Sequence, residues 1–228
     1  MSEEPAAAEP IESEEAAEAE AGPSLDPEAL ERRRLALSEV RQFGDPVLKS
    51  RASEVTAFGP QLAEEADRMV ALMQGALGIG LAATQLGVMR RMLVFQAGPD
   101  SAPRAIVNPE IEWVSEDMVT AEEGCLSLSK IVVDVERPLY ARVSAQGLEG
   151  ERLLLEAAGL EARVLQHEID HLDGVLILDR TVREQRRAAL RALRSGESFD
   201  PAMLEPDPEI EPAADGAAEP AAEEAGGR

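Results

Sequence analysis

The chain has 228 residues, a single cysteine, two histidines and a formal net charge of −23. Its length suits one domain of ordinary size with additional segments, and no stretch approaches the roughly 18 apolar residues that a membrane span requires. The acidic start has neither the basic nor the apolar region of a secretory signal, and one cysteine cannot form an internal disulfide, so we expect a cytoplasmic protein.

The negative charge lies mainly in the two ends of the chain. Residues 1–30 carry ten acidic groups and no basic group, and residues 197–228 carry ten acidic groups and one arginine. Both ends are rich in Ala, Glu and Pro and have few large apolar residues, so they cannot bury enough surface to offset chain entropy. We therefore expect disordered acidic tails at 1–30, where a lead-in helix begins, and at 197–228, on either side of one domain at 31–196.

Apolar spacing and turn residues predict the elements of this domain in chain order. A helix at 26–43 ends near Gly44, a turn and a short extended segment cover 44–48, and a second helix covers about 60–76. Short strands are predicted at 91–96, 105–108, 111–115, 118–122 and 130–136, and the strands 139–145 and 151–156 pair across a glycine-containing turn. A long helix at 157–172 and an arginine-rich helix at about 181–193 complete an α+β fold.

Both histidines lie in the pentapeptide HEIDH at 167–171. Residues four apart share one face of a helix, so His167 and His171 can bind one metal ion, and Glu168 can serve as a general base for a water that the metal activates. The alternative is an ordinary helix whose histidines are satisfied by hydrogen bonds. Two apolar stripes on this helix suggest that it is buried, and buried histidines need partners that a metal would supply.

Cys125 lies in the turn-like segment EGCLS at 123–127. A set of Cys125, His167 and His171 would leave a fourth metal position open, as in catalytic sites. A single cysteine is also often a small buried hydrophobe, and this alternative stays open on Cys125 alone.

The segment GIGLAATQ at 78–85 has two glycines but neither the third glycine of a dinucleotide fingerprint nor the Lys-Ser/Thr of a P-loop. It indicates a backbone that approaches another chain closely, with the Gln85 amide available as a donor.

Together, GIGLAATQ, EGCLS and QHEIDH (166–171) resemble the peptide deformylase family in order, spacing and identity, and GDPVL (44–48) is similar to the family's opening. The resemblance covers about residues 38–190. It implies small mixed or antiparallel sheets around a central metal-bearing helix, with a C-terminal helix. After Ser127, Leu128-Ser129 replaces a proline-containing continuation, and the acidic tails are outside the family pattern.

The resemblance implies a metal-dependent hydrolase that removes the formyl group from the N-terminal formyl-methionine of new polypeptides and releases formate. Cys125, His167 and His171 would hold one divalent ion, with Fe²⁺ expected and Zn²⁺ or Ni²⁺ as replacements. Glu168 would be the general acid and base, and the Gln85 amide and the Leu126 backbone N–H would stabilise the carbonyl oxygen.

The resemblance also implies roles around this centre. Gly80 would pair its backbone with the extended substrate, and Ile79 and Leu160, with Leu126, would receive the methionine side chain, although core packing is an alternative for Ile79 and Leu160. Glu123 would support the metal ligands, with Arg137 as its partner.

The expected partners are formyl-methionyl nascent peptides, with no membrane or DNA contact. Six arginines near the last helix suggest ribosome contact, or they balance the acidic tails: Arg180, Arg183, Arg186, Arg187, Arg191 and Arg194. Two other functions remain open at this point. A zincin-type metalloprotease would need a third ligand other than histidine, and an inactive ribosome-binding protein would retain the fold without activity.

Overall fold

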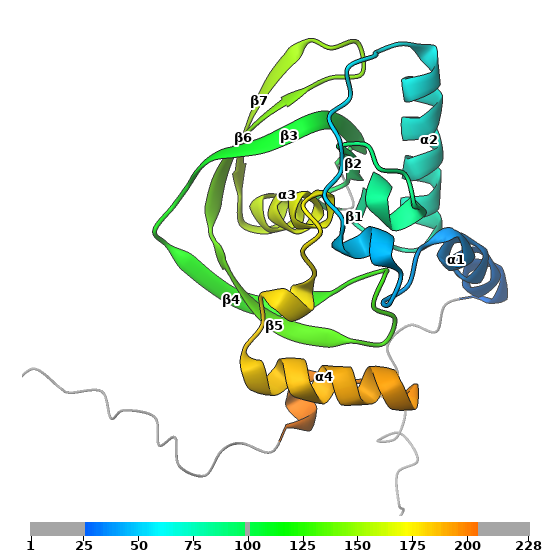
Figure 1. The fold of residues 1–228 in the computed structure, drawn as a ribbon, viewed down its shortest axis with the longest axis vertical. Coiled ribbons are helices and arrows are strands. Elements are labelled where there is room, and N and C mark those ends of the chain that lie inside the picture. Colours follow the sequence, from blue (N-terminus) through cyan, green and yellow to red (C-terminus); the bar gives the residue numbers. More distant parts are fainter. Residues whose placement is uncertain (1–25, 99–100, 205–228) are drawn as a thin grey trace, which may run out of the picture.

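The computed structural model describes residues 26–98 and 101–204, and these form the predicted α+β fold (Figure 1). The helices are α1 (Pro27–Glu39), α2 (Pro60–Gly75), α3 (Gly159–Leu172) and α4 (Arg183–Ser195). The strands are β1 (Gly80–Ala82), β2 (Met92–Phe95), β3 (Arg104–Val114), β4 (Met118–Gly124), β5 (Val132–Pro138), β6 (Tyr140–Gln146) and β7 (Arg152–Ala158). Among the described residues, no helix combines the length and apolar composition needed to cross a membrane.

Two antiparallel sheets surround α3. The larger has the strand order β1-β2-β3-β6-β7, and the smaller is the β4-β5 pair. Figure 1 shows α3 in the centre of the molecule, with the larger sheet curving past it and β4-β5 on the other side. The predicted pairing of the last two strands is confirmed, with Val143 opposite Leu155.

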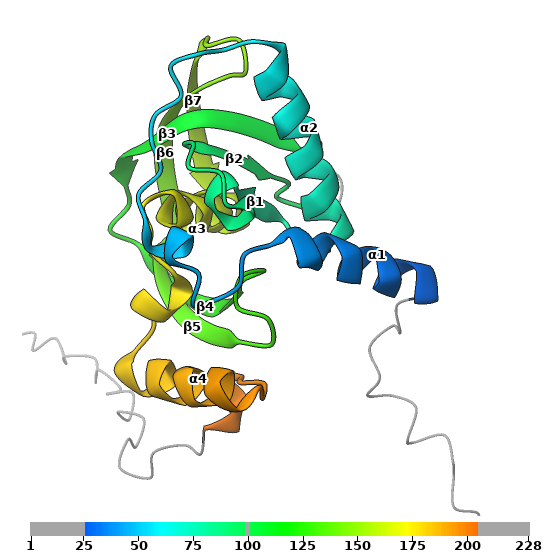
Figure 2. The ribbon, with the colours of Figure 1, turned by 45° about the vertical axis from the view of Figure 1, so that its right-hand side comes forward.

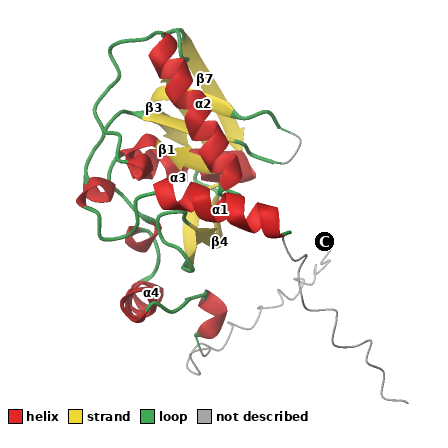
Figure 3. Cartoon of the chain, turned by 90° about the vertical axis from the view of Figure 1, so that its right-hand side faces the viewer, coloured by secondary structure: helices red, strands yellow, loops and turns green. Residues whose placement is uncertain are grey.

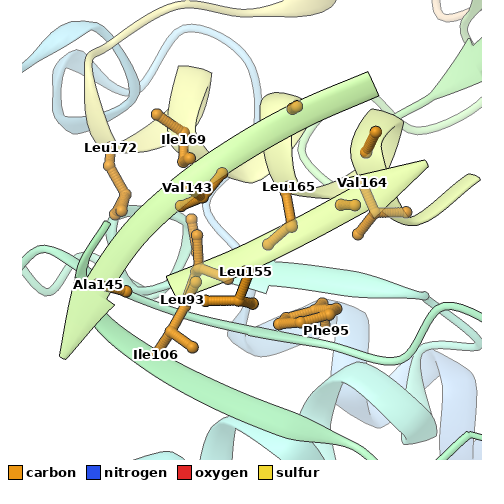
Figure 4. Close-up of a cluster of buried hydrophobic side chains, with 14 of the residues drawn as sticks. Leu93, Phe95, Ile106, Val143, Ala145, Leu155, Val164, Leu165, Ile169 and Leu172 are labelled. Atoms are coloured by element: carbon orange, nitrogen blue, oxygen red, sulfur yellow. The ribbon is translucent and has the colours of Figure 1, made fainter. Parts of the chain in front are cut away.

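The larger sheet is buried on both faces where it carries β2. Leu93 and Phe95 point into a cluster with α3 that includes Ile106, Leu165 and Ile169 (Figure 4). The alternate residues Met92 and Val94 pack with Met69 and Met73 of α2. Since successive side chains of a strand point to opposite faces, β2 is apolar throughout and holds α2 and α3 on opposite faces of the sheet.

The helix α1 packs against the C-terminal end of α2. Figure 2 shows α1 between α2 and the β4-β5 sheet. The close approach depends on Gly75, where an added β-carbon would lie 3.2 Å from the Cβ of Ala36. Asp26 caps the start of α1 by accepting a hydrogen bond from the Ala29 N–H at 2.7 Å.

Several predicted element boundaries are wrong. Pro46–Lys49 is a short 3-10 helix, not an extended segment, because the Asp45 side chain caps it through the Val47 N–H. The strands predicted at 105–108 and 111–115 are one strand, β3, whose pairing with β6 shifts register twice near Asn108 and Ile111. The strand β1, inside the glycine-rich segment, was not predicted.

The C-terminal part of the described chain packs against the smaller sheet. Figure 3 shows α4 set apart from the larger sheet, with the chain continuing beyond it. Phe199 is 5% exposed and packs in a cluster with Leu128, Ile131 and Ala189. The folded part therefore extends past 196 to at least Leu204, while residues 1–25 and 205–228 of the predicted tails lie outside the described residues.

Candidate metal centre

The helix α3 carries both histidines and the glutamate between them. Glu168 and His171 are buried, at 4% and 1% exposure, and His167 is half-buried. The two imidazole rings lie on one face of α3, with their centroids 4.9 Å apart. The helix thus presents the two ring systems together, as the spacing predicts.

Cys125 reaches these rings from the turn that follows β4. Its Sγ lies 3.1 Å from Nε2 of His171. One ligand atom from each of Cys125, His167 and His171 lies within 4.8 Å of the others. Tetrahedral coordination at usual metal–sulfur and metal–nitrogen distances separates ligand atoms by about 3.5 Å, so the three side chains can hold one ion with little movement.

Glu123 orients the first histidine. Nδ1 of His167 lies 2.9 Å from Oε2 of Glu123, which leaves Nε2 for a metal. Arg137 donates to both carboxylate oxygens of Glu123, at 2.6 and 3.0 Å. Burial alone would raise the pKa of Glu123, but the hydrogen bonds from His167 and Arg137 outweigh burial and lower the pKa to about 2.

The surroundings of His167 favour a positive charge at the centre. Burial opposes protonation of the ring, yet hydrogen bonds with Cys125 and Glu123 raise the pKa of His167 well above its usual value. Burial, with the positive charges of His167 and Arg137, lowers the pKa of His171 instead. Two imidazoles beside a sulfur, in a pocket that attracts a cation, are a donor set that suits Fe²⁺ or Zn²⁺.

Glu168 lies beside the ligands with one oxygen free. Oε2 of Glu168 and Nδ1 of His171 are buried and have no hydrogen-bond partner among the described residues. Burial raises the pKa of Glu168 to about 7. A carboxyl group with a pKa near neutrality can both accept and donate a proton at that pH, and its unpartnered oxygen is free to do so.

The expected oxyanion donors are both at this centre. Gln85 is 1% exposed, its Oε1 accepts the Ala82 N–H at 2.8 Å, and its Nε2 points to Ser127 Oγ at 3.2 Å and Cys125 Sγ at 3.8 Å. The bond from Ala82 thereby sets which end of the amide faces the sulfur. The Leu126 N–H follows Cys125 directly and makes no hydrogen bond within the described residues.

A cavity of about 570 Å³ opens over these groups, and Ile79, Gly80, Leu126 and Leu160 line it. Ile79 and Leu160 are 46% and 51% exposed, so the core-packing alternative for them is wrong. β1 is the edge strand of the larger sheet beside this cavity. Its free edge can accept an extended peptide as an added strand.

Gly80 has a second role that the sequence did not reveal. A β-carbon at this position would lie 2.3 Å from Oε1 of Glu168 and 2.8 Å from its Cγ. Such a contact is far shorter than any real one, so only glycine leaves room for the glutamate on α3 to lie against β1.

The sequence reasoning missed two charged residues of the same network. Arg163, one helical turn before His167, donates to Oε1 of Glu123 at 2.6 Å and to the Val119 and Val135 carbonyls. Asp170 is buried and accepts from Arg137 at 2.9 Å. The spacing of Arg163 from His167, four residues on one helix face, is the sequence signal that could have indicated it.

The unusual Leu128-Ser129 pair forms two consecutive turns that lead into β5. The Leu128 N–H donates to the Cys125 carbonyl and the Ile131 N–H to the Leu128 carbonyl, at 2.9 and 3.1 Å. Leu128 is buried, and the Ser129 hydroxyl lies 3.0 Å from Oε1 of Gln42. The loop therefore holds Cys125 without the proline, and the serine adds a hydrogen bond that proline cannot make.

Comparison with known proteins agrees with this geometry. The sequence model of one family, described as polypeptide deformylase, matches residues 37–187. The chain is 45% identical to the peptide deformylase of Thermotoga neapolitana over 152 residues, which is 67% of this chain and 91% of that protein. It is 42% identical to peptide deformylase 1 of Corynebacterium efficiens over 168 residues, covering 73% and 99%.

Solved structures show the same likeness. The crystal structure of peptide deformylase from Thermotoga maritima is 45% identical in sequence, with a TM-score of 0.61, and the match covers 63% of this chain and 96% of that one. The peptide deformylase of Synechococcus elongatus in complex with actinonin is 36% identical, with a TM-score of 0.65 and coverage of 70% and 88%.

Proposed function

Because the chain belongs to the peptide deformylase family, we propose that the cleft around Cys125, His167 and His171 is its active site. The protein is a metal-dependent hydrolase that removes the formyl group from the N-terminal formyl-methionine of newly made polypeptides. The observation that carries the assignment of the site is the convergence of one sulfur and two imidazoles beside the buried carboxyl of Glu168.

Cys125, His167 and His171 would hold the ion, and we propose Fe²⁺, with Zn²⁺ or Ni²⁺ as replacements. A thiolate and two neutral imidazoles suit these borderline cations. The ion, when bound, acidifies a water and polarises the formyl carbonyl. Glu123 would keep His167 in the tautomer that turns Nε2 to the ion, with Arg137 and Arg163 holding Glu123 in place.

Glu168 would take the proton from the attacking water and deliver it to the departing amine. Its raised pKa, near 7, supports both roles, because the group exchanges a proton at neutral pH. The free Oε2 supports the same assignment, since the expected partner of that oxygen is the water.

Gln85 and Leu126 would stabilise the negative charge that develops on the formyl oxygen. The bond from Ala82 holds the Gln85 amide with its Nε2 toward Cys125 Sγ, and the Leu126 N–H has no partner within the described residues, so both donors already lie beside the expected ligands. Loss of one such donor typically raises the activation barrier by about 2.7–4 kcal/mol.

The methionine side chain would lie between Ile79, Leu126 and Leu160, with the peptide backbone along the edge of β1. These apolar groups are partly exposed and line one cavity together, which supports a binding role.

An assay of formate release tests the function and the metal together. We expect protein purified anaerobically and loaded with Fe²⁺ to release formate from formyl-Met-Ala-Ser, and not to cleave an unformylated peptide internally. Metal analysis of the same sample gives the occupancy. Fully metal-loaded protein that releases no formate would contradict the proposal.

Contact with the ribosome is a further part of the proposal. Arg183, Arg187 and Arg191 are exposed on α4 and form no ion pair within the described residues, whereas Arg180 is used internally by Asp170. An exposed basic helix suits a phosphate-rich surface. A deletion of residues 181–228 would test this contact, but it would also remove Ala188 and Ala189 from a buried cluster. Substitution of the exposed arginines by Glu is therefore the sharper test, with salt-dependent ribosome binding as the measurement.

We place the reaction in the cytoplasm, which the single unpaired cysteine supports because its thiolate must stay reduced to bind a metal. We propose residues 31–196, extended by the packed segment up to 204, as the catalytic unit.

A further inference from the structure

The helix α1 forms part of the wall of the active-site cavity. Arg33 and Leu37, which lie one turn apart on the same helix face, line the cavity together with Leu77 and Lys130. The segment that matches the deformylase family begins only at residue 37. Arg33 is therefore a cavity residue that lies outside the matched segment.

Arg33 and Lys130 are cations without a carboxylate partner. Both are exposed, and neither forms an ion pair within the described residues. The next residue, Arg34, differs: it pairs with Glu31 at 2.7 Å and does not line the cavity. The cavity wall thus presents two positive charges that no carboxylate in 26–98 or 101–204 pairs with.

Lys130 is held firmly in this position. Its carbonyl accepts the Phe199 N–H at 2.9 Å, and the Val132 N–H donates to the Phe199 carbonyl at 2.9 Å. Its backbone has φ +68°, a left-handed conformation that is uncommon for lysine and that these contacts maintain.

Both cations line the cavity at the metal centre. Lys130 lies in the loop between β4 and β5, which also carries Cys125 and Ser129, and Ser129 contacts Gln42, shortly after α1. Glu122, the exposed carboxylate of the cavity wall, lies further back on β4, opposite Asp134. The loop and α1 therefore each add one positive charge to the cavity wall.

We propose that Arg33, together with Lys130, selects substrates that carry a side-chain carboxylate in the residues shortly after formyl-methionine. This inference rests on the proposed active site, since the formyl group must lie at the metal centre. An extended peptide advances about 3.3 Å per residue, so the third and fourth residues reach the rim of a cavity of this size. An aspartate or glutamate there meets cations that form no ion pair in the part of the chain that the structure describes.

The test compares kcat/KM for formate release from formyl-Met-Ala-X-amide and formyl-Met-Ala-Ala-X-amide, with X as Glu, Gln or Lys. The amides remove the terminal carboxylate, which nascent chains do not carry near their start. We expect Glu to be favoured over Gln by about two- to fivefold at one of the two positions, as for other exposed ion pairs, and the preference to fall as salt rises.

The variant Arg33→Glu should lower kcat/KM for the Glu peptide and raise it for the Lys peptide. Arg34→Glu is the matched control: it makes the same change of charge on the neighbouring residue of α1, away from the cavity, and should leave the preference as in the unaltered protein. Equal kcat/KM for Glu and Gln at both positions, or the same response to both substitutions, would overturn the inference. Absence of formate from every peptide would instead contradict the proposed function.

Discussion

Glu123 connects the candidate metal ligands to the rest of the protein. Its carboxylate contacts His167 and receives hydrogen bonds from Arg137 and Arg163. Arg137 in turn bonds Asp170, so one buried and one half-buried arginine share one network with two buried carboxylates. Removal of one member leaves its buried partners uncompensated, which costs far more than loss of an exposed ion pair.

The ionisation of Glu123 should appear in the pH dependence of stability of the metal-free protein. The folded state lowers the pKa of Glu123 from 4.5 to about 2. The group therefore stabilises the fold above pH 4.5, and this stabilisation, about 3 kcal/mol, is lost as pH falls toward 2.

We expect Glu123→Gln to lower the free energy of unfolding at pH 6 and to flatten its decline between pH 4.5 and 3. Urea unfolding at a series of pH values measures both. Glu122→Gln, a change at the exposed neighbour on the same strand, is the control and should keep the decline. An unchanged slope in Glu123→Gln would show that the network does not depend on this charge.

Glu168 allows a direct separation of binding from chemistry. Glu168→Gln keeps the shape of the side chain and all three expected ligands, so metal content should be retained while kcat falls by at least about 10²-fold. Metal analysis and formate release on one sample measure the two quantities. Glu161→Gln, the same change earlier on α3, is the control and should keep both metal content and formate release. Substantial turnover in Glu168→Gln would refute the general-base role.

At the scale of elements, the site depends on how closely α3 approaches β1. The larger sheet ends with β1, and Gly80 in this strand is the point where Glu168 of α3 lies against the backbone. The strand has only three residues, yet it supplies one wall of the cavity and the room for Glu168, the proposed general base.

We expect Gly80→Ala to reduce turnover strongly without removing the metal. The added methyl would occupy the place of the Glu168 carboxylate, since the three atoms nearest to it all belong to Glu168 and none to an expected metal ligand. Formate release and metal content again distinguish the two effects. Full activity in Gly80→Ala would show that β1 and α3 can separate at little cost, contrary to their packing.

At the scale of the whole molecule, the boundary suggested by net charge differs from the boundary of the packed structure. Most of the net negative charge belongs to the first and last 30 or so residues, while residues 31–196 are close to neutral. The folded part nevertheless reaches beyond 196, because Phe199 completes the cluster under β5 and pairs with the loop that follows Cys125.

Two truncations test where the folded part ends. Removal of residues 205–228 should leave the free energy of unfolding and kcat/KM almost unchanged. Removal of residues 197–228 takes away Phe199 as well, and loss of a buried aromatic side chain typically costs about 3–5 kcal/mol. Thermal unfolding of both variants measures the difference, and equal stability would place the boundary at 196.

From the sequence alone, the family could be identified and a ligand set and general base predicted, because these depend on residue identity and short-range spacing. HEIDH places both imidazoles on one helix face whatever surrounds it, and EGCLS and GIGLAATQ add the specificity that a single motif lacks. Most helices and strands followed from the same local periodicity.

Only the tertiary structure decided which distant groups meet. Arg163 and Asp170 join the Glu123 network, Gly80 makes room for Glu168, Phe199 supports the Cys125 loop, and Arg33 of α1 reaches the cavity. Each of these contacts joins segments on different elements. Their distances depend on how sheets and helices pack; local spacing can place Arg163 on the same helix face as His167, but it cannot show which residue of another element lies opposite.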